Sequence, residues 1–101
     1  MEYSFSNEGS QRELSLRGRL AFTDHDAFRD IVAQFGQPGP STCSVNLSGL
    51  EAIDSAGLGL LIPVNDAAKE NNISVTLRGA RDQVKRMLEL TMITEVISVA
   101  D

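Results

Sequence analysis

The stretch that decides the fold is Ile53-Asp54-Ser55-Ala56-Gly57-Leu58-Gly59. Before it, apolar and polar side chains alternate over Cys43–Ser48, which indicates a strand with one buried face. After it, a mostly apolar run reaches Val64 and good helix formers follow. We expect a helix there, although the apolar run alone is also compatible with a strand. The Ser55 hydroxyl then lies beside the Asp54 carboxylate where a loop turns into a helix, a position from which Ser55 can face outward.

Outward from this stretch, the chain alternates between strand and helix patterns. Asn7–Ser10 indicates a hairpin turn, and Thr23 is a good N-cap for the first helix. Pro63 is expected to bend the second helix or to lie in its early part. We expect strands near residues 3–5, 14–20, 43–48, 73–77 and 96–99, and helices near residues 24–35, 55–70 and 84–91.

The alternation within the strands predicts how the helices pack. A parallel sheet that is covered on both faces reads as continuous apolar runs, whereas nearly every strand expected here is apolar on one face only. We therefore expect one α/β domain over residues 1–101, with a mixed β-sheet and helices packed mainly on one of its faces.

Composition and charge exclude several classes of function. The chain has 101 residues, with 14 acidic against 9 basic side chains and a net charge of −5. This acidity argues against binding of nucleic acid or direct contact with an anionic membrane surface, because both need a basic surface. The N-terminus does not resemble a signal peptide and no apolar run is long enough to span a bilayer, so we expect a cytoplasmic protein. The single Cys43 is expected to be a small buried hydrophobe.

The chain has few side chains that could act in catalysis. His25 is the one histidine, no phosphate-binding glycine loop is present, and we expect no metal ion, no cofactor and no enzymatic activity. Two other interpretations of the motif stay open at this point. Asp54 and Ser55 could be a base and a nucleophile, although an ordinary aspartate is a poor base for a serine hydroxyl. Ser55 could also be a plain helix N-cap.

The order of elements resembles the STAS domain, with Ile53–Gly59 opening the second helix. This is the fold of bacterial anti-sigma factor antagonists, and it is also found in the tails of sulphate transporters. Three further segments fit the resemblance, namely Gly18–Leu20, Val45–Leu50 and Val84–Leu88. The resemblance covers essentially the entire chain.

The resemblance implies a phosphorylation-controlled protein-binding switch in signal transduction and transcription regulation. In antagonists of this kind, the serine after the motif aspartate is phosphorylated by a cognate GHKL-type kinase, which is itself the anti-sigma factor. A PP2C-type phosphatase removes the phosphate. Carried onto this chain, the phosphorylated residue is Ser55, and the glycines let a partner approach closely. The partner-binding residues that the resemblance implies are Asp54, Ala56, Gly57, Leu58, Gly59, Thr23 and Asp24.

The chain departs from the family pattern at two places, and the second departure favours an alternative. Arg19–Phe22 stands where the antagonists often have an acidic pair, and Ala56 stands where many of them have Ser or Thr. The sequence Ser-Ala-Gly is closer to the STAS subunits of lipid-trafficking ABC transporters. In that alternative the chain is a non-switching subunit that binds the transporter ATPase. A small hydrolase or nucleotide-binding site is a third possibility.

One group of basic residues lies outside the motif. It consists of Arg78, Arg81, Lys85 and Arg86, around the start of the last helix. The group is either a solvated helix face or part of a docking surface for an acidic partner.

Overall fold

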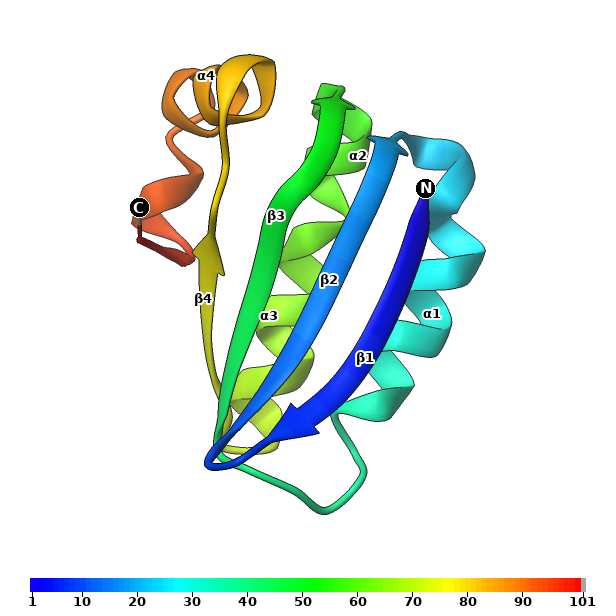
Figure 1. Ribbon diagram of the computed structural model, residues 1–101, viewed down its shortest axis with the longest axis vertical. Coiled ribbons are helices and arrows are strands. Elements are labelled where there is room, and N and C mark those ends of the chain that lie inside the picture. The colour runs from blue at the N-terminus through cyan, green and yellow to red at the C-terminus, as the bar shows by residue number, and fades with distance from the viewer. Residues whose placement is uncertain (101) are drawn as a thin grey trace.

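The computed structural model describes residues 1–100, which form a layered α/β fold around one mixed sheet (Figure 1). Within these residues the sheet has five strands in the order β1-β2-β3-β4-β5. β1 runs antiparallel to β2, and every other neighbouring pair is parallel. The strands are β1 (Glu2–Glu8), β2 (Gln11–Leu20), β3 (Thr42–Ile53), β4 (Ser74–Arg78) and β5 (Ser98–Val99). The helices are η1 (Phe22–Asp24), α1 (His25–Gln34), α2 (Ser55–Gly59), α3 (Leu61–Glu70), α4 (Asp82–Leu90) and η2 (Ile93–Glu95), where η marks a short 3-10 helix.

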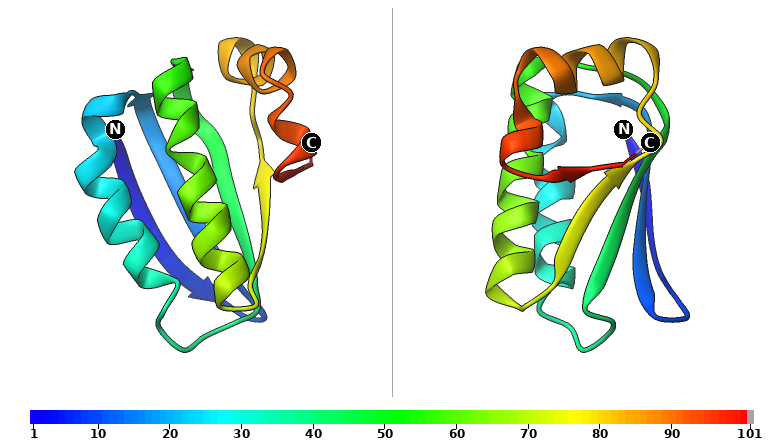
Figure 2. Two further views of the ribbon diagram at one scale, coloured as in Figure 1. Left: turned by 180° about the vertical axis from the view of Figure 1, so that it is seen from behind. Right: turned by 90° about the vertical axis from the view of Figure 1, so that its left-hand side faces the viewer.

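The helices leave one face of the sheet open, as the alternation in the strands predicts. α1 and α3 lie side by side on one face, and α4 lies at the end of the sheet where β3 finishes (Figure 2). Along β2, Leu14 and Leu16 are fully buried toward the helices, whereas Ser15 and Arg17 point to the other face. The predicted mixed sheet with one-sided helix packing is confirmed.

β3 is longer than the sequence pattern indicates, because it continues past Ser48 to Ile53. The alternation breaks at Gly49, where the pairing with β2 shifts register. A Cβ atom at Gly49 would lie 2.8 Å from Cγ of Arg17, so the two strands stay adjacent here because Gly49 has no side chain. The extension brings the end of β3 directly to the motif.

The predicted helix over residues 55–70 is two helices that meet at Leu60. Pro63 is the third residue of α3, where a missing N–H removes no intrahelical hydrogen bond. Asn72 follows α3 with a φ of 58°, in the left-handed region that commonly ends helices. The last expected strand is reduced to Ser98–Val99, because Val96 and Ile97 form the turn that follows η2.

Candidate functional site

The aspartate of the motif caps α2. Asp54 Oδ1 accepts a hydrogen bond from the Gly57 backbone N–H at 2.6 Å, and Asp54 itself has extended backbone angles, as an N-cap residue should. The Asp54 N–H also donates to the Leu20 carbonyl oxygen at 3.3 Å. This second bond fixes the start of α2 to the end of β2. The alternative in which Ser55 is the N-cap is therefore wrong.

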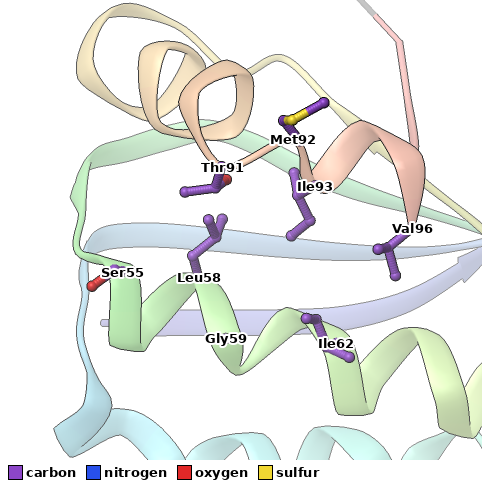
Figure 3. A pocket seen from close by; sticks show the side chains of 8 residues that line it. All are labelled: Ser55, Leu58, Gly59, Ile62, Thr91, Met92, Ile93 and Val96. Carbon is purple, nitrogen blue, oxygen red and sulfur yellow. The ribbon is translucent and has the colours of Figure 1, made fainter.

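Ser55 is the first residue of α2 and is exposed. Its Oγ atom makes no hydrogen bond within residues 1–100, because the carboxylate of Asp54 already satisfies the N–H group that a capping hydroxyl would bind. In Figure 3 the hydroxyl oxygen points outward, away from the neighbouring cavity. The structure thus presents an exposed hydroxyl with no structural task.

Gly57 has an internal reason to be glycine. It is buried against the end of β2, where a Cβ atom would overlap the carbonyl oxygen of Leu20 and lie 2.8 Å from its carbonyl carbon. Leu58 is 4% exposed and belongs to the hydrophobic core. Ala56 and Gly59 are exposed, and nothing lies within 4 Å of a Cβ built on Gly59. The exposed part of the motif is therefore Asp54, Ser55, Ala56 and Gly59.

An apolar cavity of about 210 Å³ opens beside Ser55, between α2–α3 on one side and the chain after α4 on the other (Figure 3). We call it the Ser55 groove. Three of its side chains remain well exposed: Ile62 at 38%, Met92 at 58% and Val96 at 47%. Apolar side chains that gather in this way are typical of contact surfaces. The groove is lined by Ser55, Leu58, Gly59, Ile62, Thr91, Met92, Ile93 and Val96.

Sequence reasoning did not find the second wall of this groove. Met92, Ile93 and Val96 follow α4, and the chain from Val96 onward was expected to be a strand. Met92 has a φ of 56°, which turns the chain back after α4 so that Ile93 is buried and Met92 is exposed. The apolar residues just after a helix were the available signal.

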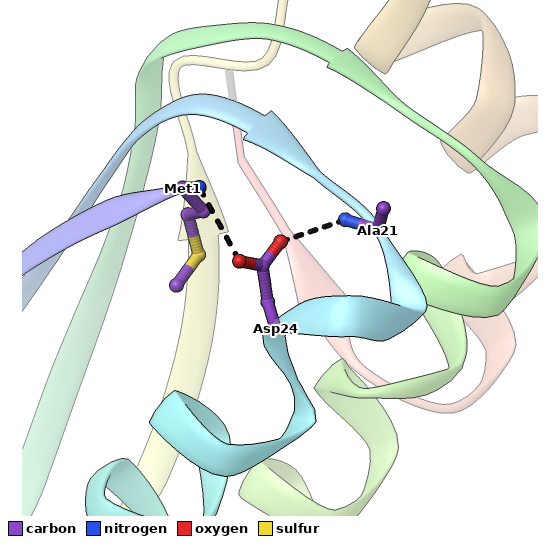
Figure 4. Close-up of polar contacts among 3 residues, drawn as sticks. All are labelled: Met1, Ala21 and Asp24. Carbon is purple, nitrogen blue, oxygen red and sulfur yellow. Dashed lines mark hydrogen bonds and ion pairs between the residues drawn. The ribbon is translucent and has the colours of Figure 1, made fainter.

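The predicted neighbours of the motif lie in η1, which contacts α2. The Asp24 carboxylate accepts a hydrogen bond from the Ala21 N–H at 2.9 Å and forms an ion pair with the Met1 amino group at 3.3 Å (Figure 4). Thr23 is not the cap of α1, as the sequence suggested; it lies inside η1, exposed, and α1 begins at His25. The reason is that the Asp24 carboxylate closes a 3-10 turn onto Ala21 ahead of α1.

A side chain from α4 holds the residue that precedes the motif. The Gln83 side-chain amide donates to the Ile53 carbonyl oxygen at 2.8 Å and accepts from the Ile53 N–H at 2.9 Å. These two bonds imitate one pairing step of a neighbouring strand. Gln83 is a site-positioning residue that the sequence analysis did not single out.

The remaining chemistry near the motif is sparse. His25 Nδ1 lies 3.2 Å from an Asp26 carboxylate oxygen, and within residues 1–100 it makes no hydrogen bond to Ser55. Burial raises the pKa of the Cys43 thiol to about 11, which keeps this buried cysteine protonated at neutral pH. The described residues contain no group of three side chains able to hold a metal ion. They also contain no helix that combines the length and the apolar character needed to cross a membrane.

Comparison with known proteins supports the resemblance seen in the sequence. A family model for STAS_2, described as "Mlab, STAS domain", matches residues 3–98. The chain belongs to the STAS domain family. Among relatives, a STAS-domain containing protein from Pseudomonas aeruginosa is 24% identical over 95 residues, which is 94% of this chain and 93% of that protein. The anti-sigma-B factor antagonist of Staphylococcus aureus is 25% identical over 86% of this chain and 81% of its own length.

Solved structures show the same STAS fold. A candidate anti-sigma factor antagonist from Thermotoga maritima superposes with a TM-score of 0.82 at 20% identity, covering 98% of this chain and 86% of its own. The anti-sigma factor antagonist SpoIIAA in its unphosphorylated form gives a TM-score of 0.73 at 17% identity, covering 99% of this chain and 88% of its own. The phosphorylated form of SpoIIAA from Bacillus gives 0.71 at 15% identity, covering 99% and 92%.

Proposed function

We propose that this STAS domain is a protein-binding switch of the anti-sigma factor antagonist type. Its unphosphorylated form binds a GHKL-type kinase that acts as an anti-sigma factor, phosphorylation of Ser55 by that kinase releases the partner, and a PP2C-type phosphatase restores the binding form. The observation that carries the proposal is the exposed Ser55 hydroxyl, which has no hydrogen bond within residues 1–100 and lies at the rim of an apolar groove. The antagonists among the relatives support the partner class.

The docking surface in this proposal combines polar and apolar parts. Asp54, Ala56 and Gly59 surround Ser55, and Thr23 lies in the adjacent η1. Asp24 and Gly57 contribute by shaping the backbone, because both are engaged in internal contacts. A partner that inserts apolar side chains into the Ser55 groove covers the exposed parts of Ile62, Met92 and Val96, and Leu58 forms the floor. Such filled pockets carry most of the binding energy in protein interfaces.

Phosphate on Ser55 changes the charge of this surface without disturbing the fold. It adds about −1.5 to −2 charges directly beside the Asp54 carboxylate. A partner that has docked against a neutral hydroxyl must then desolvate or approach two neighbouring anions. A penalty of about 3 kcal/mol lowers affinity roughly a hundredfold, which is enough to release the partner.

The test uses Ser55→Ala, Ser55→Glu and the unmodified chain. Each is used as bait in an extract from the source organism, and any kinase that is captured is purified and titrated by calorimetry. We expect wild type and Ser55→Ala to bind with similar affinity and Ser55→Glu to bind about a hundredfold more weakly. All three should have the same melting temperature. Equal affinities for the three forms would rule out the switch.

A second candidate is a non-switching STAS subunit of a lipid-trafficking ABC transporter, bound to its ATPase. The sequence Ser55-Ala56-Gly57 favours it, since it is closer to those subunits than to many antagonists. The same experiment separates the candidates. Capture of a transporter ATPase by all three forms, with no kinase, would favour the subunit.

A further inference from the structure

The open face of the sheet carries a continuous polar row. The strand register places Ser4, Ser15, Asn46 and Arg78 next to one another across β1, β2, β3 and β4. Their neighbours along the strands point to the core, so these four side chains share the face that α1 and α3 leave uncovered (Figure 1). This face is opposite the helix layer that contains one wall of the Ser55 groove.

Four arginines lie on or beside this open face, toward the carboxyl ends of β2 and β4. Arg17 and Arg19 follow Ser15 along β2, and both are exposed. Arg78 ends β4, and Arg81 follows after a turn. Gly79 brings that turn close to β3, because a Cβ there would lie 3.1 Å from Cβ of Ser48. We call Arg17, Arg19, Arg78 and Arg81 the arginine cluster.

Two members of the cluster are held in place by the sheet. Arg17 packs its Cγ atom over Gly49 and donates from Nη1 to the Ser4 hydroxyl at 3.3 Å. Arg81 donates from Nε to the Ser48 carbonyl oxygen at 3.0 Å. Each guanidinium keeps further N–H donors that no described residue binds. Because these arginine side chains are already held in place, they lose less conformational entropy on binding a ligand than freely moving arginines would.

The arginines of the cluster are not held in ion pairs. Among the described side chains, ion pairs lie at Asp24 and Asp26, and none involves one of the four arginines. Glu2 stands opposite Arg17 in the register and Glu13 lies two residues before Ser15 on the same face, but neither forms an ion pair with the cluster. In a chain with a net charge of −5, four arginines without an ion pair on one side of the sheet are a local exception.

We infer that the arginine cluster is a second docking surface, and that its ligand is an acidic segment of a partner protein. Guanidinium groups bind carboxylates with paired, charge-assisted hydrogen bonds, and Ser15 and Asn46 add neutral polar groups beside them. A polypeptide fits better than single-stranded nucleic acid, because the aromatic side chains of β1, Tyr3 and Phe5, pack against the core rather than offering stacking surfaces on this face.

The experiment uses the full chain labelled with ¹⁵N and a synthetic peptide of six consecutive glutamates as the probe. We expect amide shifts confined to residues around Ser15, Asn46, Ser48 and Arg78, and weaker binding as salt rises. The double variant Arg78→Glu/Arg81→Glu should lose at least about tenfold in affinity, whereas Arg78→Lys/Arg81→Lys should keep part of it. The matched control is Arg29→Glu on α1, which is 77% exposed on the helix side and should change nothing.

Three results would overturn the inference. The first is unchanged affinity in the charge-reversed double variant while its melting temperature stays that of the wild type. The second is a shift pattern centred on Lys69, Lys85 or Arg86 instead of the open face. The third is tighter binding of a single-stranded DNA 20-mer than of the peptide at the same residues. None of these outcomes bears on Ser55, so the proposed switch stands or falls separately.

Discussion

Gly57 and Gly59 stand two residues apart in α2, and their surroundings differ completely. Gly57 is pressed against the Leu20 carbonyl, whereas Gly59 faces open space. The resemblance to the family explains both glycines by close approach of a partner. The structure adds an internal reason for Gly57 that concerns the attachment of α2 to β2.

This difference predicts opposite effects of adding one methyl group. Gly57→Ala should lower the free energy of unfolding by about 1–3 kcal/mol, because α2 must move away from β2. Gly59→Ala should leave it unchanged or raise it by up to about 1 kcal/mol, since alanine favours a helix and meets no neighbour. Urea unfolding of both variants measures this, and equal destabilisation would contradict the packing described here.

Asp54 makes a structural hydrogen bond, whereas Ser55 makes none within residues 1–100. Asp54→Ala removes the side-chain bond to the Gly57 N–H and should lower the free energy of unfolding by about 1 kcal/mol. Ser55→Ala should leave it within about 0.5 kcal/mol of wild type, because no bond is lost. Thermal melts of the two variants check this, and a larger loss in Ser55→Ala would show a hidden structural role for the hydroxyl.

Cys43 gives a prediction at high pH. Its thiol pKa is raised from 9.0 to about 11 mainly by burial, so the folded chain holds this proton more tightly than the unfolded chain. The contribution to stability is therefore complete below pH 9 and is lost as the pH rises through 11. Between those values the stability of wild type should fall more steeply than that of Cys43→Ala, as measured by urea unfolding at each pH. Equal pH dependence of the free energy of unfolding in wild type and Cys43→Ala would contradict the raised pKa of the Cys43 thiol.

At the scale of elements, regular patterns were predicted from the sequence and irregular ones were not. The buried faces of β2 and β3 and the boundary after α3 follow from alternation and from Asn72. The continuation of β3 was missed because Ser48-Gly49 is polar and flexible in isolation, and only the pairing with β2 makes it a strand. η1 was missed because the Asp24 carboxylate reaches back to Ala21, whereas Thr23 looked like the better cap. Family resemblance, rather than periodicity, pointed to Ser55.

The two hydrogen bonds between Gln83 of α4 and Ile53 of β3 give a prediction about the positioning of the motif. Gln83→Ala leaves both backbone groups of Ile53 without their partner, and the free energy of unfolding should fall by about 1–3 kcal/mol. Amide exchange at Ile53 should also accelerate relative to the centre of β3. Lys85→Ala, on the exposed side of the same helix, is the matched control and should change neither quantity. Unaltered exchange at Ile53 in Gln83→Ala would mean that the clamp does not position the motif.

At the scale of the whole molecule, segments far apart in sequence build the two surfaces. The Ser55 groove joins α2–α3 to the chain after α4, and the arginine cluster joins β2 to the turn after β4. Neither was predictable from local pattern, because each exists only after the sheet has formed. The motif and α3 form one wall of the groove, and the residues after α4 form the other.

The groove predicts a separation of binding from stability. Met92→Ser with Val96→Ser should keep the melting temperature within a few degrees of wild type, since both side chains are about half exposed. The same double variant should weaken binding of the partner captured through Ser55 by about tenfold or more. Leu90→Ser is the control, because Leu90 is 71% exposed and lies outside the groove lining. An effect of Leu90→Ser equal to that of the double variant would remove the groove from the interface.

The double anchoring of the motif has a consequence for how a signal could leave this protein. Asp54 is bonded to the end of β2, and Ile53 is clamped by α4, so the backbone on which Ser55 stands has little freedom to move. A partner would then detect a modification at Ser55 as a change of surface charge on a rigid scaffold. The domain would need no conformational change to respond, and the rate of the response would be set by the enzymes that add and remove the modification.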